Sequence, residues 1–201
     1  MWLLRDELAK AGKLDEYQQV LEYWSGLQET RLPFQKGRDE ILDSWHTLLD
    51  AKLIAAMMTS DPAARYAKME ALSRWMSGSL CYSSGTLGGF KPDGTSFHHG
   101  GHYPAYSVGA FAAVGDFCSY TQGTEFVISE DARKTFKHVL MTMCEYCNLT
   151  DWGVGVCGRH PFNGFIPKAD IEAFASLALL GDLTGSGLDA DPELGGAYLY
   201  L

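Results

Sequence analysis

Apolar residues recur every three or four positions along most of the chain. Near the start, one stripe holds Leu14, Tyr17, Leu21 and Trp24, which is the spacing of an amphipathic helix. No segment shows the sustained alternation of apolar and polar residues that marks a half-buried strand. The pattern therefore predicts an all-α fold.

Caps and helix breakers predict where the helices begin and end. Asp61 before Pro62, and Ser129 before an acidic first turn, are typical N-terminal caps. Beyond Gly181 we expect an acidic tail with an apolar end. The predicted helices cover residues 1–27 with a break at Gly12, then 38–58, 61–76, 104–120, 130–147 and 169–180.

Two long glycine-rich stretches interrupt the helices, residues 88–103 and 148–168. Glycine has no packing side chain and loses the most backbone entropy on ordering, so we expect neither a regular helix nor a strand there. If neighbouring helices pair as antiparallel hairpins, both stretches can open at one end of the array. They would then share one cleft.

Composition narrows the class of protein. With 201 residues, of which 46% are hydrophobic, the chain is long enough for one helical domain, residues 1–201, with a substantial core. A net charge of -9 argues against nucleic acid as a partner. No apolar run is long enough to cross a membrane, and the N-terminus becomes charged too early for a secretory signal.

The cysteines allow one metal hypothesis. There are five, an odd number, so a complete disulfide framework is not expected. The spacing Cys144-x2-Cys147 followed by Cys157-x2-His160 fits a zinc-stabilised helical module, although the first pair falls in a predicted helix. The histidine cluster described next fits a transition metal or proton chemistry equally well. We predict no cofactor, and a divalent cation stays an open alternative.

The first glycine-rich stretch concentrates proton-transfer groups. Within nine positions it carries His98, His99, His102, Tyr103 and Tyr106. Loops of this kind often hold functional groups over a rigid scaffold. No nucleophile elbow accompanies them, and both stretches contain few acids, which disfavours covalent hydrolysis and glycoside hydrolysis.

These groups suit β-elimination at a uronic acid. The proton beside the sugar carboxylate is weakly acidic, so a site must supply a base, screen the carboxylate and protonate the leaving oxygen. Histidine or tyrosinate can take the proton, a tyrosine hydroxyl can give one, and arginine can stabilise the developing charge. The second stretch supplies Arg159, His160 and Asn163.

Two segments carry a resemblance to a known family. Phe90–Ser107 (FKPDGTSFHHGGHYPAYS) and Gly158–Asn163 (GRHPFN) resemble the active-site segments of the chondroitin sulfate ABC lyases, within the polysaccharide lyases that include chondroitin AC and hyaluronate lyases. The resemblance implies the second half of an (α/α) toroid. It also implies an anionic polysaccharide of the chondroitin or dermatan sulfate type as partner.

The resemblance also implies residue roles. Tyr106 would be the general acid, and the base for one uronate epimer, while His99 would be the base for the other. Arg159 would complete the catalytic set visible in this chain. Further substrate-binding candidates are His98, His102, Tyr103, His160 and Asn163.

Some family features fall outside the chain. The resemblance implies an exported enzyme, secreted or periplasmic, with flanking β-sandwich domains and a further catalytic glutamate on one of them. Gly88 stands where some members carry an acid, and His46 or Asn163 are the candidates for neutralising the substrate carboxylate. A non-catalytic carbohydrate-binding remnant is the main alternative. Apolar residues 2–4 and 198–201 predict self-association.

Overall fold

A computed structural model describes residues 2–37, 41–148, 151 and 168–201, and it is mostly helical. Short 3-10 helices, η1 (Trp2–Leu4) and η2 (Leu27–Arg31), accompany the longer elements. The α-helices are α1 (Arg5–Lys10), α2 (Leu14–Ser25), α3 (Ile41–Asp43), α4 (Leu49–Met57), α5 (Pro62–Ser79), α6 (Pro104–Thr121), α7 (Glu130–Tyr146), α8 (Lys168–Ala178) and α9 (Pro192–Tyr200).

The predicted all-α class is confirmed. The N-terminal caps that predicted two of the helix starts are also present. Gly12 separates α1 from α2 with a φ of 66°. The Asp61 carboxylate accepts the Ala64 N–H at 2.7 Å, and the Ser129 hydroxyl accepts the Ala132 N–H at 3.3 Å. These caps fix the starts of α5 and α7.

Three predictions need correction. The tail after Gly181 contains α9, capped by Asp191. The predicted regular helix over 38–58 includes a π-helical turn, η3 (Ser44–Leu48), between α3 and α4. The first glycine-rich stretch contains a hairpin of β1 (Phe97–His98) and β2 (Gly101–His102). Strands of two residues are too short to show an alternating pattern.

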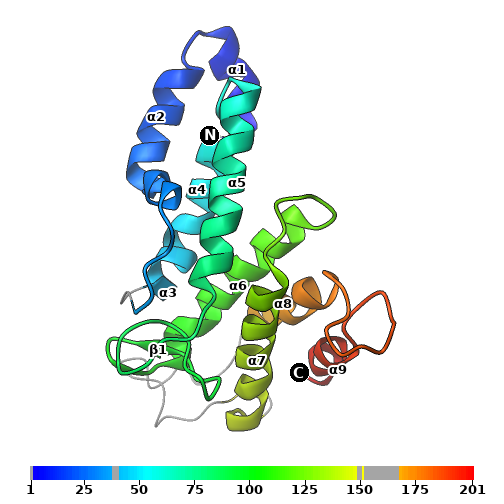
Figure 1. The fold of residues 1–201 in the computed structure, drawn as a ribbon. Coiled ribbons are helices and arrows are strands. Elements are labelled where there is room, and N and C mark those ends of the chain that lie inside the picture. Colours follow the sequence, from blue (N-terminus) through cyan, green and yellow to red (C-terminus); the bar gives the residue numbers. More distant parts are fainter. Residues whose placement is uncertain (1, 38–40, 149–150, 152–167) are drawn as a thin grey trace.

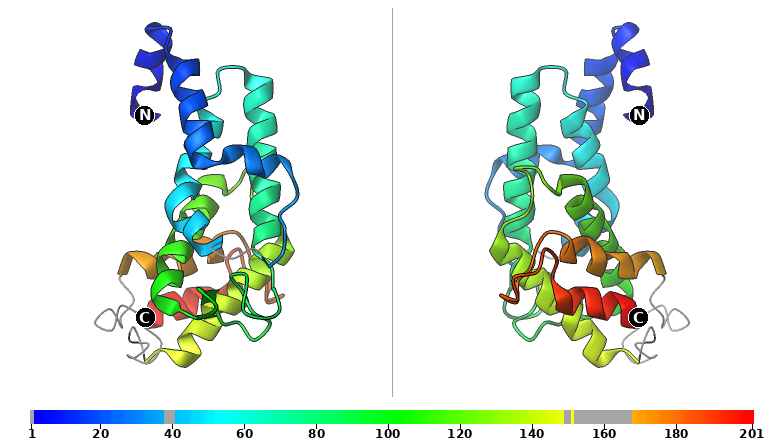
Figure 2. Two further views of the ribbon diagram at one scale, coloured as in Figure 1. Left: turned by 90° about the vertical axis from the view of Figure 1, so that its left-hand side faces the viewer. Right: turned by 90° about the vertical axis from the view of Figure 1, so that its right-hand side faces the viewer.

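Helix α6 lies at the centre of the molecule (Figures 1 and 2). On one side of it α2, α4 and α5 form an elongated group, and on the other α7, α8 and α9 pack near the C-terminus. The contact between α6 and α8 is close, because a Cβ on Gly115 would lie 2.8 Å from the Ala173 Cα. Closure of these helices into a toroid stays a prediction.

A buried lysine ties α2 to α4. The Lys52 side chain is fully buried, and its ammonium donates to the Ser25 carbonyl at the end of α2. The same ammonium lies 2.9 Å from a Glu29 carboxylate oxygen. A buried cation placed at a helix C-terminus is stabilised by the helix dipole as well as by its carboxylate partner.

The cap of α9 also holds that helix to α7. The buried Asp191 carboxylate accepts hydrogen bonds from the Lys137 ammonium at 2.7 Å and from the backbone of Leu183 and Leu194, each at 3.1 Å. Burial alone would raise the pKa of Asp191, but these bonds outweigh burial and lower it. Asp191 therefore joins two helices through its charged form.

We expect Asp191→Ala to lower the free energy of unfolding by about 2 kcal/mol at neutral pH, the value of charged hydrogen bonds to a buried group. Because the folded-state pKa is the lower one, this stabilisation is complete above the ordinary carboxyl pKa. It is lost as pH falls below about 4. Denaturant titration at neutral and acid pH measures it. Asp189→Ala, at an exposed position in the same loop, is the control. Equal stability of both variants at neutral pH would contradict the assignment.

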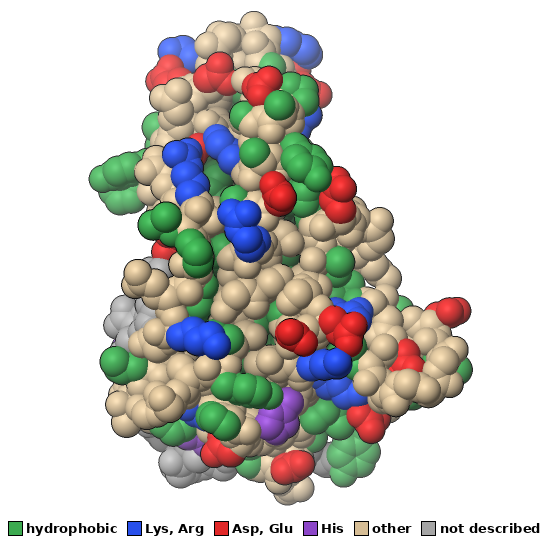
Figure 3. All heavy atoms as spheres, in the orientation of Figure 1, with side chains coloured by type: hydrophobic (Ala, Val, Ile, Leu, Met, Phe, Trp, Pro, Cys, Tyr) green, Lys and Arg blue, Asp and Glu red, His purple; other side chains and the backbone are tan. Residues whose placement is uncertain are grey.

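The surface carries exposed apolar residues near both ends of the chain. Leu3 is 94% exposed and Leu199 is 84% exposed, whereas Tyr198 and Leu201 pack against the core. The predicted apolar patch at residues 198–201 is therefore only partly exposed. On the face seen in Figure 3, acidic and basic side chains are interspersed. Among the described helices, none combines the length and apolarity needed to cross a bilayer.

Candidate active site

The first glycine-rich stretch is anchored in the core by Phe90. This ring is almost completely buried, and its centroid lies 5.2 Å from that of Trp45, 6.0 Å from that of Phe111 and 6.2 Å from that of Phe136. Single β-bridges pair Phe90 with Tyr82 and with Ser96. The loop that follows is therefore fixed at its base by aromatic packing from three helical segments.

A tight turn then docks the loop on α7. The Gly94 N–H donates to the Lys91 carbonyl at 2.9 Å. The Asp93 carboxylate accepts the Thr95 N–H at 3.0 Å and its hydroxyl at 2.7 Å, and these bonds lower the pKa of Asp93. Gly94 has a φ of 81°, and a Cβ there would lie 2.1 Å from the Thr142 hydroxyl oxygen of α7. Only glycine satisfies both constraints.

We expect Gly94→Ala to destabilise the protein more than Gly12→Ala. Gly12 has a similar φ of 66° but no neighbouring atom within 4 Å of a Cβ, so it measures the backbone cost alone. That cost is on the order of 1 kcal/mol, and the clash at Gly94 adds to it. Thermal unfolding of both variants, with Gly94→Ala/Thr142→Ala as a partial rescue, measures the difference. Equal losses would show that the turn does not dock on α7.

The register of the hairpin sends its side chains to two faces. Phe97 pairs with His102, and His98 pairs with Gly101. Directly paired residues share a face and successive residues alternate, so His98 and His102 lie on opposite faces. The buried Ser96 and Ser107 hydroxyls hydrogen-bond to each other and so tie the hairpin to the first turns of α6.

One face of the hairpin meets the start of α6 and forms a cluster of four rings. The His98 ring centroid lies 3.9 Å from that of His99 and 4.3 Å from that of Tyr106. His99 and Tyr106 are 5.6 Å apart, and Tyr103 and Tyr106 are 4.8 Å apart. His99 is exposed, Tyr106 is half-buried, and His98 and Tyr103 are buried. We call these four residues the ring cluster.

The backbone of His99 is in an unusual conformation. Its φ is 51°, and no other non-glycine residue in the described part of the chain has a positive φ. A left-handed conformation costs a residue with a Cβ roughly 1 kcal/mol or more and tends to persist at functional sites. Here it turns an exposed imidazole towards Tyr106.

The α3 to α4 segment supplies two more polar residues to this region. Asp43 Oδ2 lies 3.5 Å from His98 Nε2. His46, in the π-helical turn, packs on α6, since a Cβ on Gly109 would lie 2.8 Å from His46 Nε2. Gly109 stands one turn after Tyr106, so His46 lies on the tyrosine-bearing side of α6, whereas Asp43 reaches the ring cluster through His98. Single π-helical turns are frequent at functional sites.

Comparison with known proteins identifies the family. The whole chain, residues 1–201, matches the family described as "Lyase, catalytic". The chain belongs to this lyase family. It is 32% identical over 200 residues to a chondroitin sulfate ABC exolyase of Bacteroides thetaiotaomicron and 31% identical over 204 residues to one of Proteus vulgaris. These matches cover 100% of this chain and 19% and 20% of the two relatives.

A third relative is the chondroitin sulfate ABC endolyase of Proteus vulgaris, 26% identical over 179 residues, which cover 88% of this chain and 17% of the relative. The resemblance found in the sequence is therefore confirmed. The chain spans about a fifth of the length of the curated relatives that it matches.

The structure separates the candidate residues of this family member. It brings His98, His99, Tyr103 and Tyr106 together, but His102 lies on the other face of the hairpin. There the His102 ring stacks on Phe97 at 6.4 Å and meets Tyr146 edge-on at 4.7 Å. Burial lowers the pKa of His102, and nearby Asp93 opposes part of this effect. His102 supports the hairpin against α7.

The remaining candidates, Arg159, His160 and Asn163, lie outside the described residues. The same holds for Cys157 and so for half of the predicted zinc set. Of the other half, Cys147 is largely buried, which raises the pKa of its thiol to about 12. The zinc-stabilised module therefore stays an untested alternative. Within the part of the chain that the structure describes, no cluster of three metal-binding side chains occurs.

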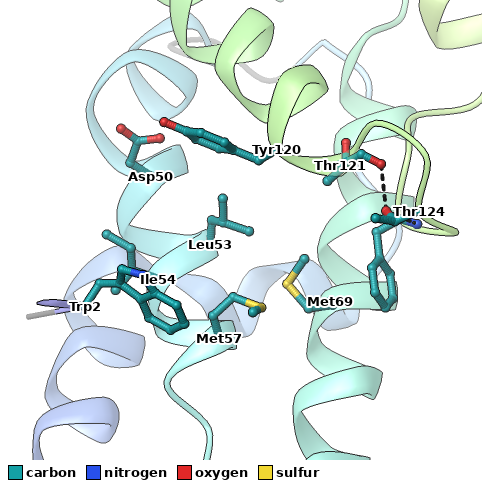
Figure 4. A pocket seen from close by; sticks show the side chains of 10 residues that line it. Trp2, Asp50, Leu53, Ile54, Met57, Met69, Tyr120, Thr121 and Thr124 are labelled. Carbon is teal, nitrogen blue, oxygen red and sulfur yellow. Dashed lines mark hydrogen bonds between the residues drawn. The ribbon is translucent and has the colours of Figure 1, made fainter. Parts of the chain in front are cut away.

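A separate pocket lies between α4, α5 and the C-terminal end of α6, away from the ring cluster at the start of α6. It has a volume of about 520 Å³ and is mostly apolar. Leu53, Ile54 and Met57 of α4 line it, and Asp50 and Tyr120 lie next to each other at one side (Figure 4). None of the residues predicted to act in catalysis lines it. The candidate active site is therefore the ring cluster and not this pocket.

Proposed function

We propose that this lyase cleaves a uronic-acid-containing glycosaminoglycan of the chondroitin or dermatan sulfate type by β-elimination. The observation that carries the proposal is the ring cluster itself, in which an exposed imidazole and a half-buried phenol stand with their centroids 5.6 Å apart in a chain of the lyase family. A base and an acid this close together can both reach one sugar residue bound beside them.

The reaction needs two proton transfers. A base removes the proton from the carbon beside the uronate carboxylate, and an acid protonates the glycosidic oxygen as its bond to the sugar breaks. Tyr106 gives the proton to the leaving oxygen, and as tyrosinate it takes the proton from an epimer whose proton lies on the same face. His99 takes the proton from the opposite face. Arg159 stabilises the negative charge that develops on the carboxylate.

The substrate class follows the names of the relatives, which are chondroitin sulfate ABC lyases. A chain with a net charge of -9 has to meet a polyanion with local groups. His46 is exposed on the tyrosine-bearing side of α6 and is our candidate for contact with the uronate carboxylate. Asn163 is the other candidate that the sequence offers.

The test is the ultraviolet absorbance of the double bond that elimination creates. We expect chondroitin sulfate to give unsaturated product slowly with the 201-residue chain. We expect faster product formation with a chimera in which the chain replaces its matched segment in the Bacteroides exolyase. Saturable binding with no product from either protein would favour the carbohydrate-binding alternative.

A further inference from the structure

His98 was predicted to bind substrate, but its place in the structure indicates a different role. Its side chain is completely buried, with Asp43 on one side and the rings of His99 and Tyr106 on the other. A ring without exposed surface does not reach a polysaccharide in this conformation. It does reach both residues that the proposed mechanism uses.

The contacts of His98 are short enough to restrict its neighbours. Its ring centroid is 4.3 Å from that of Tyr106 with planes 34° apart, and 3.9 Å from that of His99 with planes 40° apart. A buried ring at these distances limits the side-chain rotation of both. It also packs against the one described non-glycine residue with a positive φ, so it helps to hold that conformation.

Asp43 in turn restricts His98. Its carboxylate is 3.5 Å from His98 Nε2 and comes from α3, 55 positions earlier in the chain. A carboxylate beside an imidazole favours one orientation of the ring and the protonated nitrogen facing the oxygen. Asp43 is 40% exposed at its side chain, so replacing it does not leave a buried cavity.

We propose that Asp43 and His98 form a positioning pair that fixes the geometry of Tyr106 and His99. This inference rests on the proposed elimination reaction for its kinetic consequence, but the pair itself is a structural feature that is measured separately. Asp43 acts on His98, and His98 acts on the two residues that contact substrate. Neither member of the pair touches the reacting atoms.

The kinetic test compares Asp43→Asn, His98→Gln and the double variant in the 201-residue chain. We expect each single variant to lower kcat about tenfold or more with KM within twofold, because misplacing a catalytic group weakens turnover more than binding. The double variant should be no slower than the slower single variant, since both break one unit. Asp50→Asn, an exposed acid on α4, should match the unsubstituted chain. The proposal would be overturned if the losses of the two single variants multiplied in the double variant. It would also be overturned if the kcat of each single variant stayed within twofold of that of the unsubstituted chain.

A second readout does not depend on turnover. The described titratable groups facing His98 are Asp43 from α3, His99 from the hairpin, and Tyr103 and Tyr106 from α6. Histidine side-chain NMR of the folded chain should give a lower pKa for His98 in Asp43→Asn, because a neighbouring negative charge favours the imidazolium, and no change in Asp50→Asn. If neither the unsubstituted chain nor the chimera makes unsaturated product, the proposed function fails while this titration still decides the pair. An unchanged His98 titration in Asp43→Asn would reject it.

Discussion

Replacing Tyr106 with phenylalanine is expected to abolish elimination while the fold stays intact. The substitution removes one hydroxyl from a half-buried ring at the start of α6, and the contacts of the ring with His98 and Tyr103 remain. Without the hydroxyl, no group at this position protonates the leaving oxygen. We expect a loss of about 10²- to 10⁴-fold in kcat, the range for a general acid.

Tyr120→Phe is the matched control for this variant. Tyr120 lies near the other end of α6 and is exposed, so losing its hydroxyl should leave turnover unchanged. Circular dichroism and thermal unfolding establish that both variants fold. Near-normal product formation by Tyr106→Phe would mean that another residue is the acid.

His99→Ala is expected to slow elimination much more on one uronate epimer than on the other. Tyr106 reaches the proton on the same face of the sugar as the leaving oxygen, but a proton on the opposite face needs a second base. We expect a difference of about a hundredfold between the losses on glucuronate-containing and iduronate-containing chains.

The comparison of two substrates contains its own control. Any loss of stability in His99→Ala lowers the rates on both polymers alike, so the ratio of the two losses isolates the role of the imidazole. Alanine also has a Cβ, so the cost of the positive φ at this position stays, and it acts in the same way on both substrates. Equal losses would remove the proposed division of labour between His99 and Tyr106.

Most of the helices were predictable because local signals determine them. Asp61 and Ser129 cap α5 and α7 by contacts within four residues. The same Asp-Pro signal at Asp191 begins α9, yet the apolar end of the chain carries too few polar positions to show a helical stripe. The π-helical turn at 44–48 was not predictable, since one extra residue in a turn leaves the apolar spacing nearly unchanged.

The candidate site was predictable only where its residues are neighbours in sequence. His99, Tyr103 and Tyr106 recur at i, i+4 and i+7, and they do come together. The register of a short hairpin sends His102 to the opposite face, and no periodic pattern reports that register. Asp43 was missed because its contact with His98 depends on how the α3 to α4 segment packs on the loop.

The most direct test of the central claim is the mass of the product released from chondroitin sulfate. Elimination creates a double bond and adds no water, so the new non-reducing end is one water lighter than the product of hydrolysis. Mass spectrometry should detect the unsaturated oligosaccharide among the products of the 201-residue chain and among those of the chimera. Introducing Tyr106→Phe into either protein should remove this product. Products carrying an added water, or the same unsaturated product from Tyr106→Phe, would contradict elimination at the ring cluster.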